Sequence, residues 1–180
     1  MVNKHIIGNE TMMKGMRRYY NTWKFKHPTD IDLIRIMEKE SGMELDWYLE
    51  TFVYTTKTID YGIGAVSTNG TETMVKLERI GDMMMPVDLY VEYADGTSEI
   101  LYMPLRIMRG EKPVEFENIQ RRTLQAWPWT YPTYTLKIGR PLSEIKRIEI
   151  DATERMADID RSNNTYEAMD QTEVFEDPTK

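Results

Sequence analysis

Few side chains in this chain could hold a metal ion or attack a substrate. The 180 residues contain two histidines, His5 and His27, and no cysteine. A zinc hydrolase site commonly uses two histidines four residues apart on one helix, because that spacing directs both imidazoles at one ion. His5 and His27 lie 22 positions apart, so the sequence predicts no such site. We expect His5 to be solvated near the terminus and His27, which precedes a proline, to cap or pack at a helix junction.

Oxygen-bearing side chains alternate in the segment MADIDRSNN, residues 156–164. The alternating residues are Asp158, Asp160, Ser162 and Asn164, and this is the spacing of calcium ligands in an EF-hand loop. The sixth position, however, is Asn163 where a glycine is needed, and the twelfth is Met169 where a bidentate glutamate is needed. The segment therefore favours a turn held by side-chain-to-backbone hydrogen bonds over a calcium site.

Aromatic residues gather between prolines in WPWTYPTY, residues 127–134. The candidate residues are Trp127, Trp129, Tyr131 and Tyr134. Rigid amphipathic rings of this kind can stack on a sugar or bind a peptide, but they also seal the edge of a sandwich or an interface between domains. The sequence favours the packing role and leaves the binding role as the alternative.

The remaining composition excludes several classes of function. The chain has no G-x-S-x-G elbow and no glycine-rich phosphate loop, and no pair of its many carboxylates stands out as an acid and base. The net charge of −7 and the lack of a basic run disfavour binding to nucleic acid. No apolar run approaches the roughly 20 residues that a membrane span needs. The absence of cysteine leaves the redox compartment open.

Apolar spacing predicts three amphipathic helices at the start of the chain. Residues 9–25 place methionine and aromatic side chains three and four apart, and His27-Pro28 ends that helix. Thr29 then caps a second helix, which Gly42 ends and which buries Ile31, Ile34 and Met37. A third short helix buries Leu45, Tyr48, Leu49 and Phe52, with Trp47 beside them. Three such pieces form only half of a core, so they must pack on strands, on another copy or on residues outside this chain.

The hydrophobic period changes to two after Thr55-Thr56, which predicts strands. The clearest unit is a hairpin over residues 86–105, in which Asp95-Gly96 supplies the turn. Further alternation in residues 59–65, 75–77, 134–138 and 148–150 gives six or seven strands. We therefore predict an α+β chain: a helical segment over residues 1–56, an antiparallel β-sandwich of about seven strands over 57–161, and a loosely held acidic tail over 162–180. The fourteen methionines, Met83 to Met85 among them, are expected mainly in the core rather than on an adaptable binding face.

The run YYNTWKFKHPTDIDLIRIMEKESGMELDWYLETFVYTT, residues 19–56, resembles the closing helices of the thermolysin-like catalytic domain in bacterial zinc aminopeptidases of the aminopeptidase N family. Three later segments resemble the β domain that follows it in the same branch: VDLYVEYADGTSEILYMPLRIMRGEKP, PWTYPTY and IKRIEIDATERMADIDRSNN. The resemblance spans residues 8–164.

The resemblance implies a peptidase whose zinc is held by H-E-x-x-H and a more distant glutamate, aided by a tyrosine. None of these positions falls in this chain, so no catalytic, cofactor or metal residue is carried over, and we predict no catalysis by the chain alone. We expect a C-terminal piece of such an enzyme with a structural or substrate-gating role. Its partner would be the upstream catalytic domain or, without it, another copy bound through residues 6–54. Parent enzymes of this branch are often exported. The alternative is a free-standing β-sandwich module that binds peptide or glycan through its aromatic segment.

Overall fold

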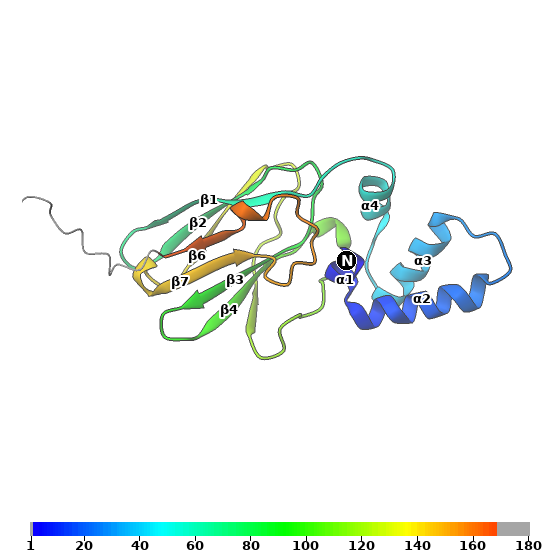
Figure 1. Cartoon of the computed structure of the whole chain (residues 1–180), viewed down its shortest axis with the longest axis horizontal. Coiled ribbons are helices and arrows are strands. Elements are labelled where there is room, and N and C mark those ends of the chain that lie inside the picture. The colour runs from blue at the N-terminus through cyan, green and yellow to red at the C-terminus, as the bar shows by residue number, and fades with distance from the viewer. Residues whose placement is uncertain (1, 169–180) are drawn as a thin grey trace, which may run out of the picture.

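The computed structural model describes residues 2–168, with side chains from residue 4 onward. A helical segment precedes two packed β-sheets, and the helices project beyond the strands at one end of the molecule (Figure 1). The predicted α+β class, with N-terminal helices followed by a largely antiparallel sheet-rich body, is confirmed.

The helical segment contains four helices and a π-helical turn. They are α1 (Val2–Ile7), α2 (Asn9–Trp23), α3 (Asp30–Ser41), α4 (Asp46–Tyr48) and η1 (Leu49–Val53). The start of α3 is fixed as the sequence predicts, because the Thr29 N–H donates to Asp32 Oδ2 at 2.9 Å. Its end is also as predicted: Gly42 adopts a left-handed φ of 71°, a conformation that glycine reaches without a Cβ penalty.

Eight strands form two sheets. The strands are β1 (Tyr61–Thr68), β2 (Thr73–Arg79), β3 (Val87–Tyr93), β4 (Ser98–Met103), β5 (Gln120–Thr123), β6 (Thr133–Ile138), β7 (Ile145–Ile150) and β8 (Thr165–Glu167). The three-stranded sheet has the order β1-β2-β6, and the five-stranded sheet has the order β5-β4-β3-β7-β8. All pairs are antiparallel except β4 with β5. Short 3-10 turns lie at η2 (Arg106–Met108), η3 (Leu142–Glu144) and η4 (Arg161–Asn163).

The predicted hairpin is the centre of the larger sheet. β3 pairs with β4 from Val87↔Met103 to Glu92↔Ser98, and Gly96 takes a φ of 81° in the turn. Alternate residues of β3 point into the core, which the two sheets share. Met83 and Met85 are also fully buried there, so the expectation that these methionines serve packing is confirmed.

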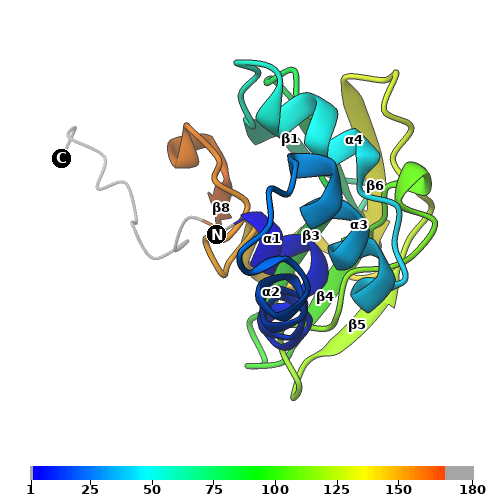
Figure 2. The same ribbon diagram turned by 90° about the vertical axis from the view of Figure 1, so that its right-hand side faces the viewer.

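The helical segment and the sandwich share one hydrophobic core. Ile6 and Ile7 of α1 are buried with residues of both sheets, and the chain between α3 and α4 adds Met43 and Leu45. A backbone hydrogen bond of 2.9 Å from Glu44 N to Met108 O ties this connection to the sandwich. Viewed from the helical end, the helices lie in front of the strands (Figure 2).

The structure differs from the predicted elements in several places. The sequence analysis did not identify α1, and the first predicted helix ends at Trp23 rather than at residue 25. β5 and β8 were also not predicted. The start of the segment expected as a loosely held tail, residues 162–180, is instead part of the fold, because β8 pairs with β7 from Arg147↔Glu167 to Glu149↔Thr165. Residues 169–180 of that tail lie outside the described residues. Among residues 2–168, the longest helices are too short or too polar to cross a bilayer.

Candidate functional site

An apolar groove of about 260 Å³ opens between α1, α3 and the α4–η1 turn. Its lining residues are Ile6, Ile7, Asp30, Leu33, Ile34, Met37, Leu45, Tyr48, Leu49, Phe52 and Val53. The helical periods of α3 and η1 put these side chains on facing surfaces, because residues three and four apart share one face of a helix. Ten of the eleven are apolar or aromatic, so the groove suits an apolar side chain of a partner.

The mouth of the groove carries a single ordered acidic group. Asp30 Oδ2 accepts a hydrogen bond from the Tyr54 hydroxyl, and Asp30 Oδ1 accepts from the Ile31 N–H at 2.9 Å. These donors, the Tyr54 hydroxyl first, hold the pKa of Asp30 below its usual value. Tyr48 and Phe52 stack with ring centroids 5.0 Å apart on the opposite wall. The groove thus has an apolar floor and a negative charge at its rim.

Several large apolar side chains of the helical segment remain exposed. They are Met13, Met16 and Tyr20 of α2, Phe25, Ile31 of α3, and Phe52, Val53 and Tyr54. The sequence predicted that Ile31 and Phe52 would be buried with their helix faces, and this is wrong: they are 45% and 43% exposed. Ile34, Met37, Leu45, Tyr48 and Leu49 are buried as predicted. The sandwich contacts only the inner part of the helical segment. The apolar side chains on the outer part of the helices are therefore not covered by any other residue in the range 2–168.

His5 is fully buried, contrary to the expectation that it would be solvated. Helix α1 packs against the sandwich and directs the imidazole at the start of β3. His5 Nε2 lies 2.9 Å from Pro86 O, and since a carbonyl only accepts, Nε2 carries the hydrogen. Nδ1 lies between Lys112 Nζ at 3.3 Å and Asp151 Oδ1 at 3.5 Å. The sequence carries no signal for this burial, because α1 is too short for its period to be read.

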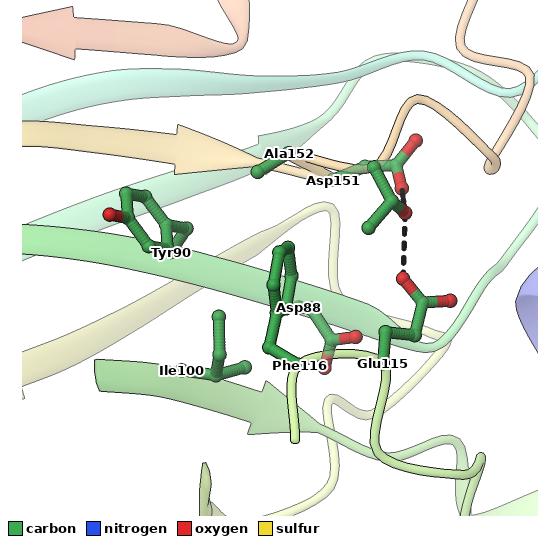
Figure 3. Close-up of a pocket in the computed structure, with 8 residues that line it drawn as sticks. Asp88, Tyr90, Ile100, Glu115, Phe116, Asp151 and Ala152 are labelled. Atoms are coloured by element: carbon green, nitrogen blue, oxygen red, sulfur yellow. Dashed lines mark hydrogen bonds between the residues drawn. The ribbon is translucent and has the colours of Figure 1, made fainter. Parts of the chain in front are cut away.

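Lys112 is the centre of a buried ion cluster around His5. Its ammonium lies 2.6 Å from Asp88 Oδ2 and 3.2 Å from Glu115 Oε1, and its side chain is fully buried. Thr153 Oγ1 donates to Glu115 Oε2 at 2.6 Å. Figure 3 shows Glu115, in the loop after η2, on the same side as Asp151 at the end of β7. The cluster therefore joins α1, β3, the loop after η2 and the residues after β7.

Asp151 completes the cluster with a depressed pKa. Burial by itself raises the pKa of Asp151, but its interaction with His5 and the backbone N–H groups of Met156 and Arg155 outweigh burial and lower it. The Met156 N–H donates to Asp151 Oδ2 at 2.7 Å, and Arg161 Nη1 lies 3.5 Å from the same oxygen. A histidine between a lysine and a carboxylate could move a proton. The space between Asp88, Glu115 and Asp151, whose side chains Figure 3 shows, is however too small for a bound molecule, so the cluster fits the role of fixing α1 on the sandwich.

The alternating oxygen side chains form the predicted turn. Asp158 Oδ1 accepts from the Asp160 N–H at 3.1 Å, and Asp160 Oδ1 accepts from the Ser162 N–H at 3.0 Å. Asp158 Oδ2 accepts from the Tyr61 N–H at 3.0 Å, which ties the turn to the start of β1. Burial raises the pKa of Asp158. Since these oxygens are already bonded to the chain, the turn explains the pattern without a calcium ion.

The aromatic segment divides into an inner and an outer pair. Trp127 is buried, donates from Nε1 to Tyr131 O at 2.9 Å, and packs edge-on against Tyr61 with centroids 5.4 Å apart. Tyr134 packs on Trp127, also at 5.4 Å, and its hydroxyl donates to Gln125 O. Trp129 and Tyr131 are 57% and 62% exposed. The favoured packing role fits the inner pair, and the outer pair is free to contact a ligand.

The described residues do not form a zinc site. His27 is exposed in the loop between α2 and α3, whereas His5 is buried in α1, so the two histidines do not share a site. Glu38, Glu44 and Asp46 bring carboxylate oxygens within 4.8 Å of one another, but Glu38 Oε1 already accepts from the Leu45 N–H at 2.8 Å. The group contains no imidazole or thiolate, which are the ligands that zinc prefers.

Comparisons with known proteins add no assignment to this geometry: neither a scan against protein-family models nor a search of curated proteins found a match to the chain.

Proposed function

We propose that the chain is the C-terminal part of a bacterial zinc aminopeptidase of the aminopeptidase N family. It would comprise the last helices of the catalytic domain and the β domain that follows. The proposal starts from the sequence resemblance, and the observation that supports it is the incompletely covered helical segment. The groove between α1, α3 and η1 and the exposed Ile31, Phe52 and Val53 fit helices that pack against a further domain.

The role that fits this chain is structural or substrate-gating. The buried cluster of His5, Asp88, Lys112, Glu115 and Asp151 attaches the helical segment firmly to the sandwich. A rigid joint of this kind would hold the β domain at a fixed angle to the catalytic domain and so shape access to the active site. The partner of the groove is then the upstream catalytic domain or, in its absence, a second copy.

The zinc of the parent enzyme would lie upstream of these residues. His5 is surrounded by Pro86, Lys112 and Asp151 and has no ring nitrogen left for a metal. His27 stands alone. No step of peptide hydrolysis is therefore assigned to this chain, and it should be inactive alone.

The coding sequence immediately upstream of Met1 tests the proposal. An in-frame H-E-x-x-H motif with a distant glutamate is the expected result, and a stop codon directly before an independent ribosome-binding site would refute it. A peptidase assay on the purified chain gives a second test. No release of N-terminal residues is expected with or without added zinc, and zinc-dependent turnover would contradict the assignment.

The alternative function is a β-sandwich module that binds peptide or glycan. The observation in its favour is the exposed pair Trp129 and Tyr131, on a loop anchored by Trp127 and Tyr134. Tryptophan fluorescence titrations with oligosaccharides and with peptides would reveal such binding. A Trp129→Ala variant should lose it if this alternative holds, whereas the peptidase proposal predicts no change in fluorescence in either protein.

A further inference from the structure

Phe25 is the most exposed large apolar residue of the described chain, at 99%. It lies in the loop between α2 and α3. Figure 1 shows this loop at the end of the two helices that project from the sandwich. Water contact over a whole phenyl ring is unfavourable by about 2 kcal/mol relative to burial. A ring in this position is suited to a partner's pocket.

The backbone at Phe25 is strained as well. Its φ of 65° places a bulky residue in the left-handed region, which costs L-residues roughly 1–2 kcal/mol. Glycine or asparagine would reach the same conformation more easily. Residues in such conformations are over-represented at sites that present a side chain to a ligand or partner.

The loop surrounding the ring is positively charged. Lys24 and Lys26 flank Phe25, and their ammonium groups lie 5.9 Å and 5.6 Å from the ring centroids of Tyr20 and Trp23. The loop therefore carries an exposed phenyl ring whose two sequence neighbours are cations, in a chain whose net charge is −7.

The groove on the same helical segment is complementary to that loop in size, polarity and charge. Its volume of about 260 Å³ exceeds the roughly 150 Å³ apolar cavity that is known to bind benzene. Its floor is apolar, and the ionised Asp30 stands at its mouth, where it would meet Lys24 or Lys26.

We propose that two copies of this chain associate by inserting Phe25 of each copy into the groove between α1, α3 and η1 of the other. The exchange is reciprocal, so that it closes into a two-fold dimer instead of an open chain of molecules. This arrangement specifies how the second copy proposed above would bind, and it rests on that proposal. It does not require that the chain come from a peptidase.

One phenyl ring does not make a stable interface alone. A buried Phe contributes about 150–250 Å², and the smaller stable interfaces bury about 1,200 Å² in total. Two rings and their two grooves supply part of this area. Other exposed apolar side chains of the helical segment would supply more: Met13, Met16, Tyr20, Ile31, Phe52 and Val53.

The first test replaces Phe25 by asparagine and measures mass by analytical ultracentrifugation over a range of concentrations. The wild-type chain is expected to be a dimer at micromolar concentration, and Phe25→Asn is expected to weaken association at least tenfold. Because asparagine tolerates a positive φ, the variant should melt at or above the temperature of wild-type monomer. Tyr131→Asn, which removes another exposed ring, should leave the dimer unchanged.

The second test blocks the groove. Val53→Arg places a cation at the mouth, where it repels Lys24 and Lys26, and should weaken association as strongly as Phe25→Asn. Val114→Arg is the matched control, because Val114 is 51% exposed against 50% for Val53 and does not line the groove. Circular dichroism of each variant checks that the fold is retained.

A mixture of the two variants separates this mode from others. Phe25→Asn keeps its groove and Val53→Arg keeps its phenyl ring, so one insertion remains possible between them. With the two variants labelled differently, the heterodimer should be tighter than either homodimer. A heterodimer no tighter than the homodimers overturns the inserted-ring mode, as does a dimer that survives both substitutions. A wild-type chain that stays monomeric overturns the association itself, whereas the upstream coding sequence decides the peptidase origin independently.

Discussion

At the scale of single residues, the buried charges around Lys112 connect the helices to the sandwich. Lys112 contacts Asp88 and Glu115, while His5 connects the cluster to α1. Buried ion pairs contribute little net stability compared with apolar packing, because desolvation offsets their attraction. Loss of one partner is different, since it leaves the other charges buried without compensation.

Replacement of Lys112 by methionine should therefore destabilise the chain by about 3–5 kcal/mol. The substitution keeps an apolar stem but leaves Asp88 and Glu115 facing one another. The free energy of unfolding in urea, measured at neutral pH and equal protein concentration, checks this. Lys137→Met serves as the control, because Lys137 is 63% exposed and lies 3.5 Å from Glu72 in a surface pair worth about 0–1 kcal/mol. Equal effects of the two substitutions would mean that the cluster does not hold the joint.

Asp151 should make stability depend on acidity. The pKa of Asp151 in the folded chain lies below its ordinary value of 3.8. As the pH falls to about 4 and lower, Asp151 therefore takes up its proton in the unfolded chain before it does so in the folded chain. The stabilising contribution of Asp151 is present above that pH and is lost as the pH falls through the folded pKa. In Asp151→Asn, urea unfolding between about pH 2.5 and 6 should give a shallower fall in stability towards acid than in the wild type.

Asp158 gives the opposite sign and serves as the comparison. Burial raises its pKa, so the folded chain holds this proton more tightly than the unfolded chain, and its contribution to stability falls as the pH rises through that window. Asp158→Asn should therefore steepen the loss of stability towards acid. The same change of slope in both variants would contradict the assignment of the two environments.

At the scale of elements, the sequence correctly predicted the features that depend on residues close together in the chain, such as helix ends and turns. Thr29 and Gly42 delimit α3, and Asp95-Gly96 forms the hairpin turn, because capping and left-handed residues act within a few positions. It missed α1 and the short strands β5 and β8, which depend on tertiary partners rather than on a period of their own. β5, with the sequence QRRT, has no apolar alternation at all and pairs in parallel with β4.

The candidate site was predictable only in part for the same reason. The sequence shows the apolar positions of α3 and η1 and the residue Phe25. The groove itself forms only when α1 packs beside α3 and η1, and the sequence does not show this packing. The burial of His5 and Lys112 likewise depends on contacts across 107 positions of the chain. Nothing within a local window distinguishes these residues from solvated charges.

Gly42 offers a test of how α3 is ended. A Cβ added at Gly42 meets nothing within 4 Å, and the same is true at Gly139, but only Gly42 has a positive φ of 71°. Gly42→Ala should cost about 1–2 kcal/mol through backbone strain alone. Gly139→Ala should be neutral or stabilising by up to about 1 kcal/mol, because it reduces the entropy of the unfolded chain. Urea unfolding of both variants measures the difference, and equal effects would show that strain at Gly42 is not what defines this helix end.

At the scale of the whole molecule, the chain has a well-covered end and an open end. The strands of both sheets bury side chains between them, with Val75, Leu77, Leu89 and Ile148 fully inaccessible. The outer faces of α2 and α3 carry exposed apolar groups instead. Local stability follows such contact density, so the two ends should open at different free energies.

Amide hydrogen exchange should resolve this difference and its dependence on association. In dilute solution, the amides of α2 and α3 should exchange roughly tenfold or more faster than those of β3, because the helices open locally while β3 opens only with the whole fold. Raising the concentration into the dimer range should slow exchange in α3 and η1 and leave β3 unchanged, since ordering at an interface protects only the elements it covers. The Phe25→Asn variant, which keeps the same helices, should lack this concentration dependence. If α2 and α3 instead exchange as slowly as β3 at every concentration, the helical segment is fully stable in the monomer. That result would contradict the proposal that this segment binds a partner.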